Sequence, residues 1–505
     1  MIRPFAAAVV FLTGSLVAAP SPWEEYFEFE KIPMPQGVDP QIGGLDFLTD
    51  GRLAAVFHRG EAMIFDPKSK EWSLFANGLQ EPLGVVAEED GSLVVMQRAE
   101  LTRLRDVDGD GRADRYETLS ADFGLTGNYH EFAFGPARGA DGHYYIALNV
   151  ASNGASMRRE IRGEFSEIGE LNREQMTEGQ DWGKSAGKAG RMYSRVPWRG
   201  WVLRVAPDGS KTEPWASGFR SPDGIGFDAK GRLLITDNQG DWRPTSPLYS
   251  VKQGGFHGHP ASLVWEAGWD GRDPLRIPVT ELAKRHHLPA GFFPQGELAN
   301  SPTQPIVAAE GSVPESIVGQ TLIGEMNQPT LVRVLDDEVG GVHQTGLVHF
   351  LDRSPLGNGN HRLAYGPDGS LYVGKTALSW AGNNGITRVK WKEKAMPLVA
   401  SIKALPNGFE IGFSEPMDGA SLGGVVIKRH TYHYHAGYGS PKVGEEAVKV
   451  NGAELREPTR LVVDCGPLKE GFLHLVDLSA VKTAGGKGLL GGKVWYHVVK
   501  APVVK

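Results

Sequence analysis

The sequence contains one cysteine, Cys465, among 505 residues. A single cysteine excludes an intrachain disulfide, a C-x-x-C-H haem attachment site, a cysteine-based zinc cluster and an iron–sulfur centre. The length of the chain is enough for two or more domains and for large buried cores.

The sequence also lacks a basic character. Its formal net charge is −7 and no run of Lys and Arg stands out, so we expect no nucleic-acid partner. Beyond the first 20 residues no stretch is apolar enough to span a bilayer. Hydrophobic residues make up 40% and charged residues 22%, which is typical of a soluble globular protein.

The N-terminus has the order of a secretory signal peptide. Arg3 precedes an apolar run from Phe5 to Leu12, and small residues follow up to Ala19, so residues 1–19 are predicted to be cleaved after Ala18 or Ala19. A membrane anchor is the less favoured interpretation, because the apolar run is short. Export without disulfides is typical of bacteria, so we expect a periplasmic, cell-surface or secreted protein with no membrane span after cleavage.

Glycine and proline are plentiful, at 66 and 33 residues, which favours an all-β protein with many tight turns. Five segments repeat the pattern of an apolar strand, a tight turn at glycine and a second apolar strand. They are GLDFLTDGRLAAVF, GVVAEEDGSLVVM, EFAFGPARGADGHYYIAL, GIGFDAKGRLLITD and RLAYGPDGSLYVGK. The spacing, about 40 to 50 residues, indicates propeller blades. With a degenerate blade after Ser312, residues 40–392 are predicted to form a six-bladed β-propeller, although five or seven blades also fit the spacing.

The pattern changes after Trp391, where short alternating strands with Asn-Gly and Gly-Gly turns run to the C-terminus. Residues 395–505 are therefore predicted to form an immunoglobulin-like β-sandwich. Within it, HTYHYHAGYGSP alternates like a strand, with His433 and His435 on one face and Tyr432 and Tyr434 on the other. Aromatic packing across strands is the favoured interpretation; a metal site at the two histidines with a third ligand is the alternative.

An acidic stretch, RLRDVDGDGRADRYETL, has oxygen donors at the spacing of a calcium loop. The candidate metal ligands are Asp106, Asp108, Asp110, Arg112, Asp114 and Glu117, at places 1, 3, 5, 7, 9 and 12. An EF-hand also needs a helix on each side, whereas this stretch lies inside a segment with the period of a blade. We therefore predict a calcium-filled turn joining two strands of blade two; the alternative is a turn of solvated carboxylates.

Polar residues cluster just before and after the strands that begin each blade. Examples are His130 in GNYHEFAFGP, Arg220 in GFRSPDGIGF, and Asn238 in TDNQGDW. Radially arranged blades would bring these residues to one axis although they lie far apart in the sequence. This axis is the place where the sequence predicts a functional site.

The stretches YHEFAFGP, GFRSPDGIGFDAKGRLLITDNQGDW, GGFHGHP and GPDGSLYVG resemble the soluble quinoprotein glucose/sorbosone dehydrogenase family. The chain is more closely similar to sorbosone dehydrogenase-like and membrane-bound dehydrogenase-domain propeller proteins of planctomycetes and verrucomicrobia. This resemblance covers nearly the whole mature chain. It implies a six-bladed propeller that holds pyrroloquinoline quinone (PQQ) and calcium on one face and oxidises a sugar.

The resemblance also implies roles for particular residues. His130 matches a base that takes the proton of a sugar hydroxyl, a task for which an imidazole is suited. The implied cofactor-binding residues are Arg220, Ser221, Gln239, Gly240, Arg362 and Lys375. Two positions depart from the family pattern: Ser221 stands where the family has Asn, and His361-Arg362 stands where paired arginines are expected.

Two hypotheses of function follow. The first is an exported oxidoreductase that acts on a sugar or related alcohol and passes electrons to a separate acceptor, since the chain has no cytochrome segment. The second is a non-catalytic propeller that binds a glycan or a protein partner at the cell surface. A metal-dependent lactonase or lyase is a third, weaker alternative, because propellers host many functions.

Overall fold

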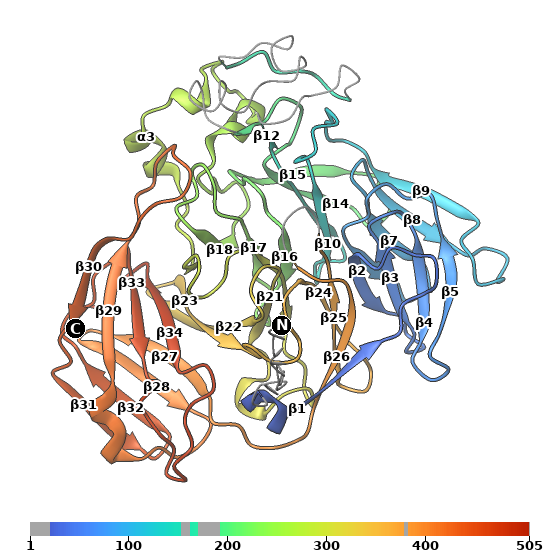
Figure 1. Ribbon diagram of the computed structural model, residues 1–505. Helices are drawn as coiled ribbons and strands as arrows, with labels where there is room; N and C mark the ends of the chain where they lie inside the picture. Colours follow the sequence, from blue (N-terminus) through green and yellow to red (C-terminus); the bar gives the residue numbers. More distant parts are fainter. Residues whose placement is uncertain (1–20, 153–161, 170–191, 378–381, 504–505) are drawn as a thin grey trace, which may run out of the picture.

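The computed structural model describes residues 21–152, 162–169, 192–377 and 382–503. Over these ranges the chain forms six blades of four antiparallel strands around one axis, with a β-sandwich at their side (Figure 1). The predicted leader, residues 1–19, lies outside the described residues. No helix among the described residues has the length and apolar character needed to cross a bilayer.

The first three blades follow one another along the chain. Blade one contains β2 (Ile42–Phe47), β3 (Leu53–Phe57), β4 (Ala62–Asp66) and β5 (Glu71–Ala76). Blade two contains β6 (Val85–Ala87), β7 (Leu93–Met96), β8 (Leu101–Arg105) and β9 (Arg115–Ser120). Blade three contains β10 (Ala133–Arg138), β11 (Tyr144–Leu148), β14 (Trp201–Val205) and β15 (Thr212–Ser217).

The second three blades complete the ring. Blade four contains β16 (Gly224–Phe227), β17 (Leu233–Thr236), β18 (Ser246–Val251) and β19 (Gly291–Phe293). Blade five contains β20 (Pro302–Val307), β21 (Thr321–Glu325), β22 (Leu331–Val339) and β23 (Val342–Phe350). Blade six contains β24 (Asn360–Tyr365), β25 (Leu371–Lys375), β26 (Gly385–Trp391) and β1 (Phe27–Ile32).

These sheets confirm the six-bladed propeller, and they show how the ring closes. The inner strands β2, β6, β10, β16, β20 and β24 contact one another in turn around the axis. The N-terminal strand β1 pairs with β26 from Phe27 opposite Trp391 to Ile32 opposite Ile386. The repeat spacing predicts that the propeller begins near residue 40, and this prediction leaves out β1. The strand could not be recognised because an outermost strand lacks the repeated turn motif.

Glycines at the starts of the inner strands allow the blades to meet closely at the axis. A Cβ on Gly84 would lie 1.7 Å from the backbone oxygen of Gly135 in the next blade. Likewise, a Cβ on Gly224 would lie 2.0 Å from the backbone oxygen of Thr303. Backbone atoms cannot move aside as a side chain can, so only glycine fits here.

The C-terminal part is a β-sandwich joined to blade five. One sheet contains β27 (Val399–Leu405), β28 (Gly408–Phe413), β32 (Arg460–Asp464) and β31 (Gly452–Glu457). The other contains β34 (Lys493–Val498), β33 (Phe472–Asp477), β29 (Val426–Thr431) and β30 (Val443–Val448). Their facing apolar side chains, such as Ile411 and Val476, share one core. β34 also pairs with β23, so the sandwich continues the sheet of blade five.

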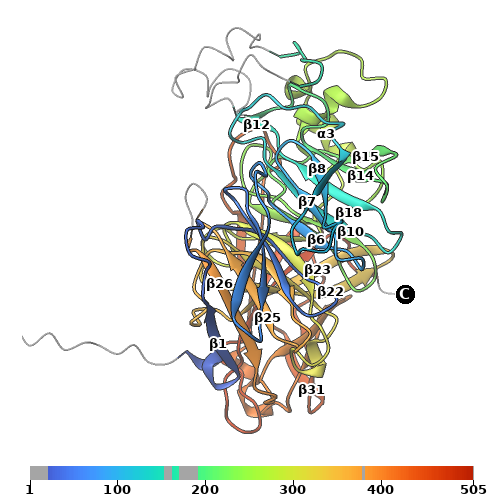
Figure 2. The same ribbon diagram turned by 90° about the vertical axis from the view of Figure 1, so that its right-hand side faces the viewer.

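The remaining elements are short. They are the pair β12 (Ala151–Ser152) and β13 (Met192–Tyr193), helix α3 (Val279–Arg285), and the 3₁₀ turns η1 (Pro22–Glu25), η2 (Pro260–Trp265), η3 (Pro274–Arg276), η4 (Glu315–Ile317) and η5 (Gly419–Gly424). Figure 2 shows α3 and β12 at the same end of the molecule.

The predicted strand over HTYHYHAGYGSP is wrong beyond its first residues. β29 ends at Thr431, and residues 432–442 form a loop before β30 begins. The loop leaves the sandwich because its tyrosines pack on the propeller: the ring of Tyr434 lies 5.4 Å from Trp242 and 4.6 Å from His286. Aromatic packing is thus confirmed for Tyr434, but it joins two domains rather than two strands.

Candidate functional site

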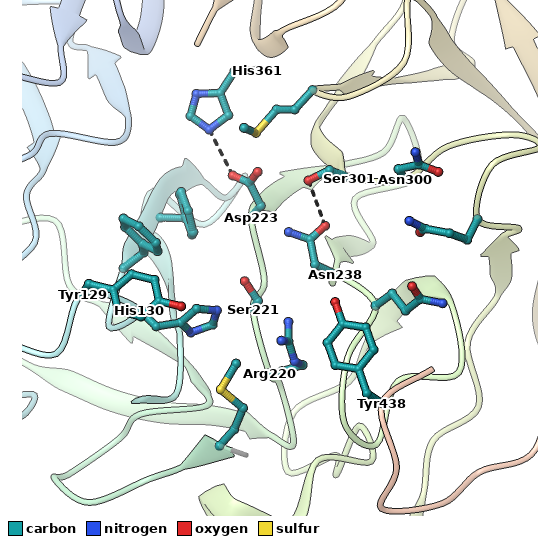
Figure 3. A pocket seen from close by; sticks show the side chains of 16 residues that line it. Tyr129, His130, Arg220, Ser221, Asp223, Asn238, Asn300, Ser301, His361 and Tyr438 are labelled. Atoms are coloured by element: carbon teal, nitrogen blue, oxygen red, sulfur yellow. Dashed lines mark hydrogen bonds and ion pairs between the residues drawn. The ribbon is translucent and has the colours of Figure 1, made fainter. Parts of the chain in front are cut away.

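A cavity of about 360 Å³ opens at one end of the propeller axis. Part of its wall comes from the residues just before the inner strands β10, β16 and β20 and from the start of the inner strand β24. Another part comes from the residues just after the second strands β17 and β21. An inner strand begins at the same edge of its blade at which the antiparallel second strand ends. This geometry gathers polar loops from four blades around one space (Figure 3).

The cavity wall is mainly neutral and polar. Amide and hydroxyl side chains line it at Asn238, Gln239, Gln295, Asn300, Ser221 and Ser301. Aromatic rings line it at Tyr129, Phe132, Phe134 and Tyr438. The hydroxyl of Ser301 donates to the amide oxygen of Asn238 at 3.2 Å, which links blades four and five at the wall.

His130 lies on this wall, as predicted from its place before β10. Its Nδ1 lies 2.8 Å from the backbone oxygen of Val150. A carbonyl oxygen can only accept, so Nδ1 carries the proton in the neutral ring and Nε2 is the acceptor nitrogen. Tyr129 and Phe132 pack on the ring at 5.7 and 6.2 Å and fix its orientation. This tautomer is the one that a base for a hydroxyl proton requires.

Arg220 also reaches the cavity, where its charge is balanced. Its Nε lies 3.3 Å from a carboxylate oxygen of the buried Asp241. Burial acts to raise the pKa of Asp241, but a hydrogen bond from His259 and the charge of Arg220 hold that pKa well below its usual value. A Cβ on Gly240 would lie 1.8 Å from Arg220 Nε, so the glycine makes room for this guanidinium.

A buried carboxylate, Asp237, holds the loop that carries Arg220 and Ser221. It accepts hydrogen bonds from the backbone N–H of Arg220 at 2.9 Å and of Ser221 at 2.7 Å. Arg243 Nε donates to the same carboxylate at 2.8 Å, and both side chains are fully buried. Asp237 therefore positions two wall residues without facing the cavity itself.

The floor of the cavity contains a second balanced cluster. Asp223 accepts from His361 Nε2 at 3.1 Å, as drawn in Figure 3, and lies 3.4 Å from Arg362 Nη1. Burial acts to raise the pKa of Asp223, but its interactions with His361 and Arg362 lower that pKa below its usual value. Asp223 is therefore an anion whose charge is already matched.

Two predicted cofactor-binding residues lie away from the cavity wall. Arg362 donates to the backbone oxygens of Gly43 and Leu83, both at 3.0 Å, and so braces the inner strands. Lys375 Nζ donates to the backbone oxygens of Leu356 and Asn358 at 2.6 and 3.0 Å. Burial lowers the pKa of Lys375 to about 7. The structure thus brings together His130, Arg220, Ser221 and Gln239, with Gly240 behind them, but neither Arg362 nor Lys375.

Several wall residues were not among those predicted from the sequence. Asn300 and Ser301 precede blade five, whose strand motif is degenerate, and their loop is shaped by the buried Glu325. This carboxylate accepts from four backbone N–H groups, those of Asn300, Ser301, Asn327 and Gln328. Burial raises the pKa of Glu325 to about 7. Glu325 lies in the sequence GEMNQP, residues 324–329, where an acid beside amide residues is the one sequence signal for this loop.

The acidic stretch forms the turn between β8 and β9 of blade two, as predicted. Carboxylate oxygens of Asp106, Asp108 and Asp114 lie within 4.8 Å of one another, and this is the one such group of potential metal ligands among the described residues. Glu117 is paired with Arg105 and Arg115 instead. Three converging carboxylates are hard oxygen donors, which suits calcium.

Two of the predicted ligand residues, Asp110 and Asp106, also accept hydrogen bonds from the backbone of the same turn. Asp110 accepts from the backbone N–H of Arg112 at 2.8 Å. Asp106 accepts from the backbone N–H groups of Gly109 and Gly111 at 2.7 and 2.8 Å. These bonds hold the turn in shape, so calcium binding would add to a loop that is already formed.

If the acidic turn binds calcium, the ion will raise the melting temperature of chelator-treated protein by a few degrees, because it binds the folded state alone. The Asp106→Asn variant should lose this calcium-dependent rise, whatever its own melting temperature. Asp208→Asn, in an exposed turn of blade three, is the matched control and should keep it. An equal rise in Asp106→Asn, or none in the wild type, would contradict calcium binding at this turn.

Three comparisons relate this chain to known proteins. Residues 65–198, about a quarter of the chain, match a family described as a domain of unknown function, DUF7133. No curated protein matches the chain. Three of the solved structures that match the chain are named for activities of different kinds.

One is a putative oxidoreductase (glucose dehydrogenase) from Thermus thermophilus, at 17% identity and TM-score 0.47, covering 72% of this chain and 99% of that one. The PQQ-bound aldose sugar dehydrogenase of Streptomyces coelicolor has 16% identity and TM-score 0.45, covering 72% and 98%. A luciferin-regenerating enzyme has 11% identity and TM-score 0.44, covering 73% and 96%. At these identities and TM-scores the similarity says nothing of activity.

Proposed function

We propose that the chain binds an uncharged sugar or related polyol in the cavity at the propeller axis. The observation that carries this proposal is the wall itself, on which six amide and hydroxyl side chains face one space beside aromatic rings. Amides and hydroxyls both donate and accept, as the hydroxyls of a sugar do. Polar groups that converge on a concave surface beside aromatic rings are typical of small-molecule sites.

The charges around the cavity support an uncharged ligand. Arg220 is the only Arg or Lys side chain among the described residues that line it, and Asp241 balances its charge. Asp223 is balanced by His361 and Arg362. A charged ligand would lose its hydration without gaining an unpaired partner, and that loss is costly.

The charged residues around the cavity also decide whether it fits PQQ, the cofactor that the resemblance implies. PQQ carries three carboxylates, whereas the wall has one arginine, already paired, and Lys375 and Arg362 donate to backbone oxygens elsewhere. The residues present therefore do not fit a tricarboxylated cofactor, and we derive no step from one.

The second candidate function, a sugar oxidoreductase, is favoured by the orientation of His130. With Nδ1–H donated to Val150, Nε2 can take the proton of a sugar hydroxyl. The carbon that carries this hydroxyl would then lose a hydride to a separate two-electron acceptor and become a carbonyl. Without such an acceptor, the same site is a glycan-binding site. The predicted leader would place either function in the periplasm or at the cell surface.

Calorimetric titration with a panel of neutral hexoses, alditols and their aldonic or uronic acids tests the proposed binding. We expect neutral sugars to bind at least 10-fold more tightly than their acids, because the acids bring an unmatched charge. Asn238→Ala should weaken binding roughly 10-fold, since it leaves polar groups unpaired, whereas the exposed Asn451→Ala should not. Tighter binding of the acids, or tight binding of PQQ with calcium, would overturn the proposal.

A further inference from the structure

Two exposed tyrosines stand at the mouth of the cavity, one from each domain. Tyr129 of blade three is 45% exposed and Tyr438 of the sandwich is 55% exposed, and both line the cavity. Figure 3 shows them on opposite sides of the space, with His130 beside Tyr129 and Arg220 near Tyr438. Large aromatic side chains that are about half exposed at a cavity mouth indicate a surface that a ligand covers.

The loop that carries Tyr438 is held firmly on blade four. The hydroxyl of Tyr434 donates to the backbone oxygen of Gly258 at 2.5 Å. The backbone N–H groups of Gly439 and Ser440 donate to the backbone oxygens of Gly240 and Pro244, at 2.9 and 2.8 Å. Residues before and after Tyr438 in the loop thus form hydrogen bonds to blade four, and these fix its backbone relative to the cavity.

The ring of Tyr438 is oriented by the wall it faces. The guanidinium carbon of Arg220 lies 5.6 Å from the ring centroid, within the range of a cation–π contact. The loop is also close-packed on Gln239, since a Cβ on Gly439 would lie 3.0 Å from its amide nitrogen. The tyrosine therefore covers the side of the cavity where Arg220 and Gln239 lie.

We propose that Tyr438 and Tyr129 form two aromatic walls that hold the ring of a cyclic sugar, so that the sandwich supplies part of the binding site. This inference rests on the proposed function and narrows its ligand to a pyranose. The carbon-bound hydrogens of a pyranose form flat apolar patches that pack on an aromatic face, while its hydroxyls reach the amides. An open-chain alditol has the same hydroxyls but no such patch.

The test compares methyl glycosides of several hexopyranoses with the corresponding alditols, by calorimetric titration of the full chain. We expect the wild type to bind at least one pyranoside 10-fold or more tightly than its alditol. Tyr438→Ala should lose most of this preference, and Tyr438→Phe should keep it, because the ring rather than the hydroxyl carries the contact. Tyr116→Ala, at a tyrosine of similar exposure on β9, should bind as the wild type does.

The outcomes separate this inference from the proposed function. Equal binding of pyranosides and alditols, with affinities unchanged in Tyr438→Ala but weakened in Asn238→Ala, would overturn the aromatic walls and leave the polyol site standing. No binding of either class by the wild type would overturn both. Loss of the preference in Tyr438→Phe as well would assign the effect to the hydroxyl and would also overturn the proposal.

Discussion

Replacing Asp237 by alanine is expected to lower the free energy of unfolding by about 3–5 kcal/mol, the usual cost of breaking a buried ion pair. The carboxylate accepts from Arg243 and from the backbone of Arg220 and Ser221, all of them buried. Without it, a charged guanidinium and two backbone N–H groups lose their acceptor away from water. Denaturant titration followed by fluorescence measures the loss.

Two further variants test whether the loss of stability comes from the Asp237–Arg243 pair. Asp237→Ala and Arg243→Ala together should cost less than the sum of the single changes, because each single change leaves the other charge unpaired. Asp208→Ala, in an exposed turn, is the control and should leave unfolding nearly unchanged. Additive costs, or a cost below about 1 kcal/mol for Asp237→Ala, would show that the pair does not hold this loop.

The Asp237→Ala variant should also bind sugar less well, although Asp237 does not line the cavity. Its two backbone contacts place Arg220 and Ser221 on the wall. Loss of affinity in the fraction that remains folded would separate this positioning role from overall stability.

The second large effect is expected at His130. If the chain oxidises sugars, His130→Ala should reduce turnover with an added electron-accepting dye by about 10²- to 10⁴-fold, the usual contribution of a positioned base. Sugar affinity should change only a few-fold, since His130 is one of many wall residues. Dye reduction under saturating sugar gives the first quantity and calorimetry the second.

His143 offers a matched control, because it lies in the same blade at the turn between β10 and β11 and not on the cavity wall. His143→Ala should turn over as the wild type does. Unchanged turnover in His130→Ala would remove His130 as the base. If the wild type reduces no acceptor with any sugar it binds, the oxidoreductase hypothesis is wrong and the glycan-binding function stands.

Much of the fold could be predicted because it repeats. The Asp-Gly turns and alternating strands indicated blades, and the spacing indicated six of them with a degenerate one, which β21 and β22 turn out to supply. The closing strand β1 could not be predicted, because an outer strand has no turn motif of its own. Its partner β26 is more than 350 residues away in sequence.

Some residues of the candidate site could also be predicted from the sequence, and others could not. His130, Arg220, Ser221 and Gln239 were predictable because each lies next to a recognisable inner-strand motif. Arg362 and Lys375 lie in equally recognisable motifs, yet their side chains turn to backbone oxygens. A motif places the backbone of a residue near the axis. The direction of its side chain depends on which neighbouring groups accept or donate its hydrogen bonds.

The sequence by itself determined the β-propeller, the following sandwich and the edge of the blades at which polar residues gather, because turn chemistry and strand alternation act over short ranges. Only the tertiary structure decided the charge balance of the cavity and the place of Tyr438. The pairings of Arg220 with Asp241 and of Asp223 with Arg362 join residues from separate turns or blades. Tyr438 reaches the wall only because its loop bonds to blade four, a contact between domains that no local pattern encodes.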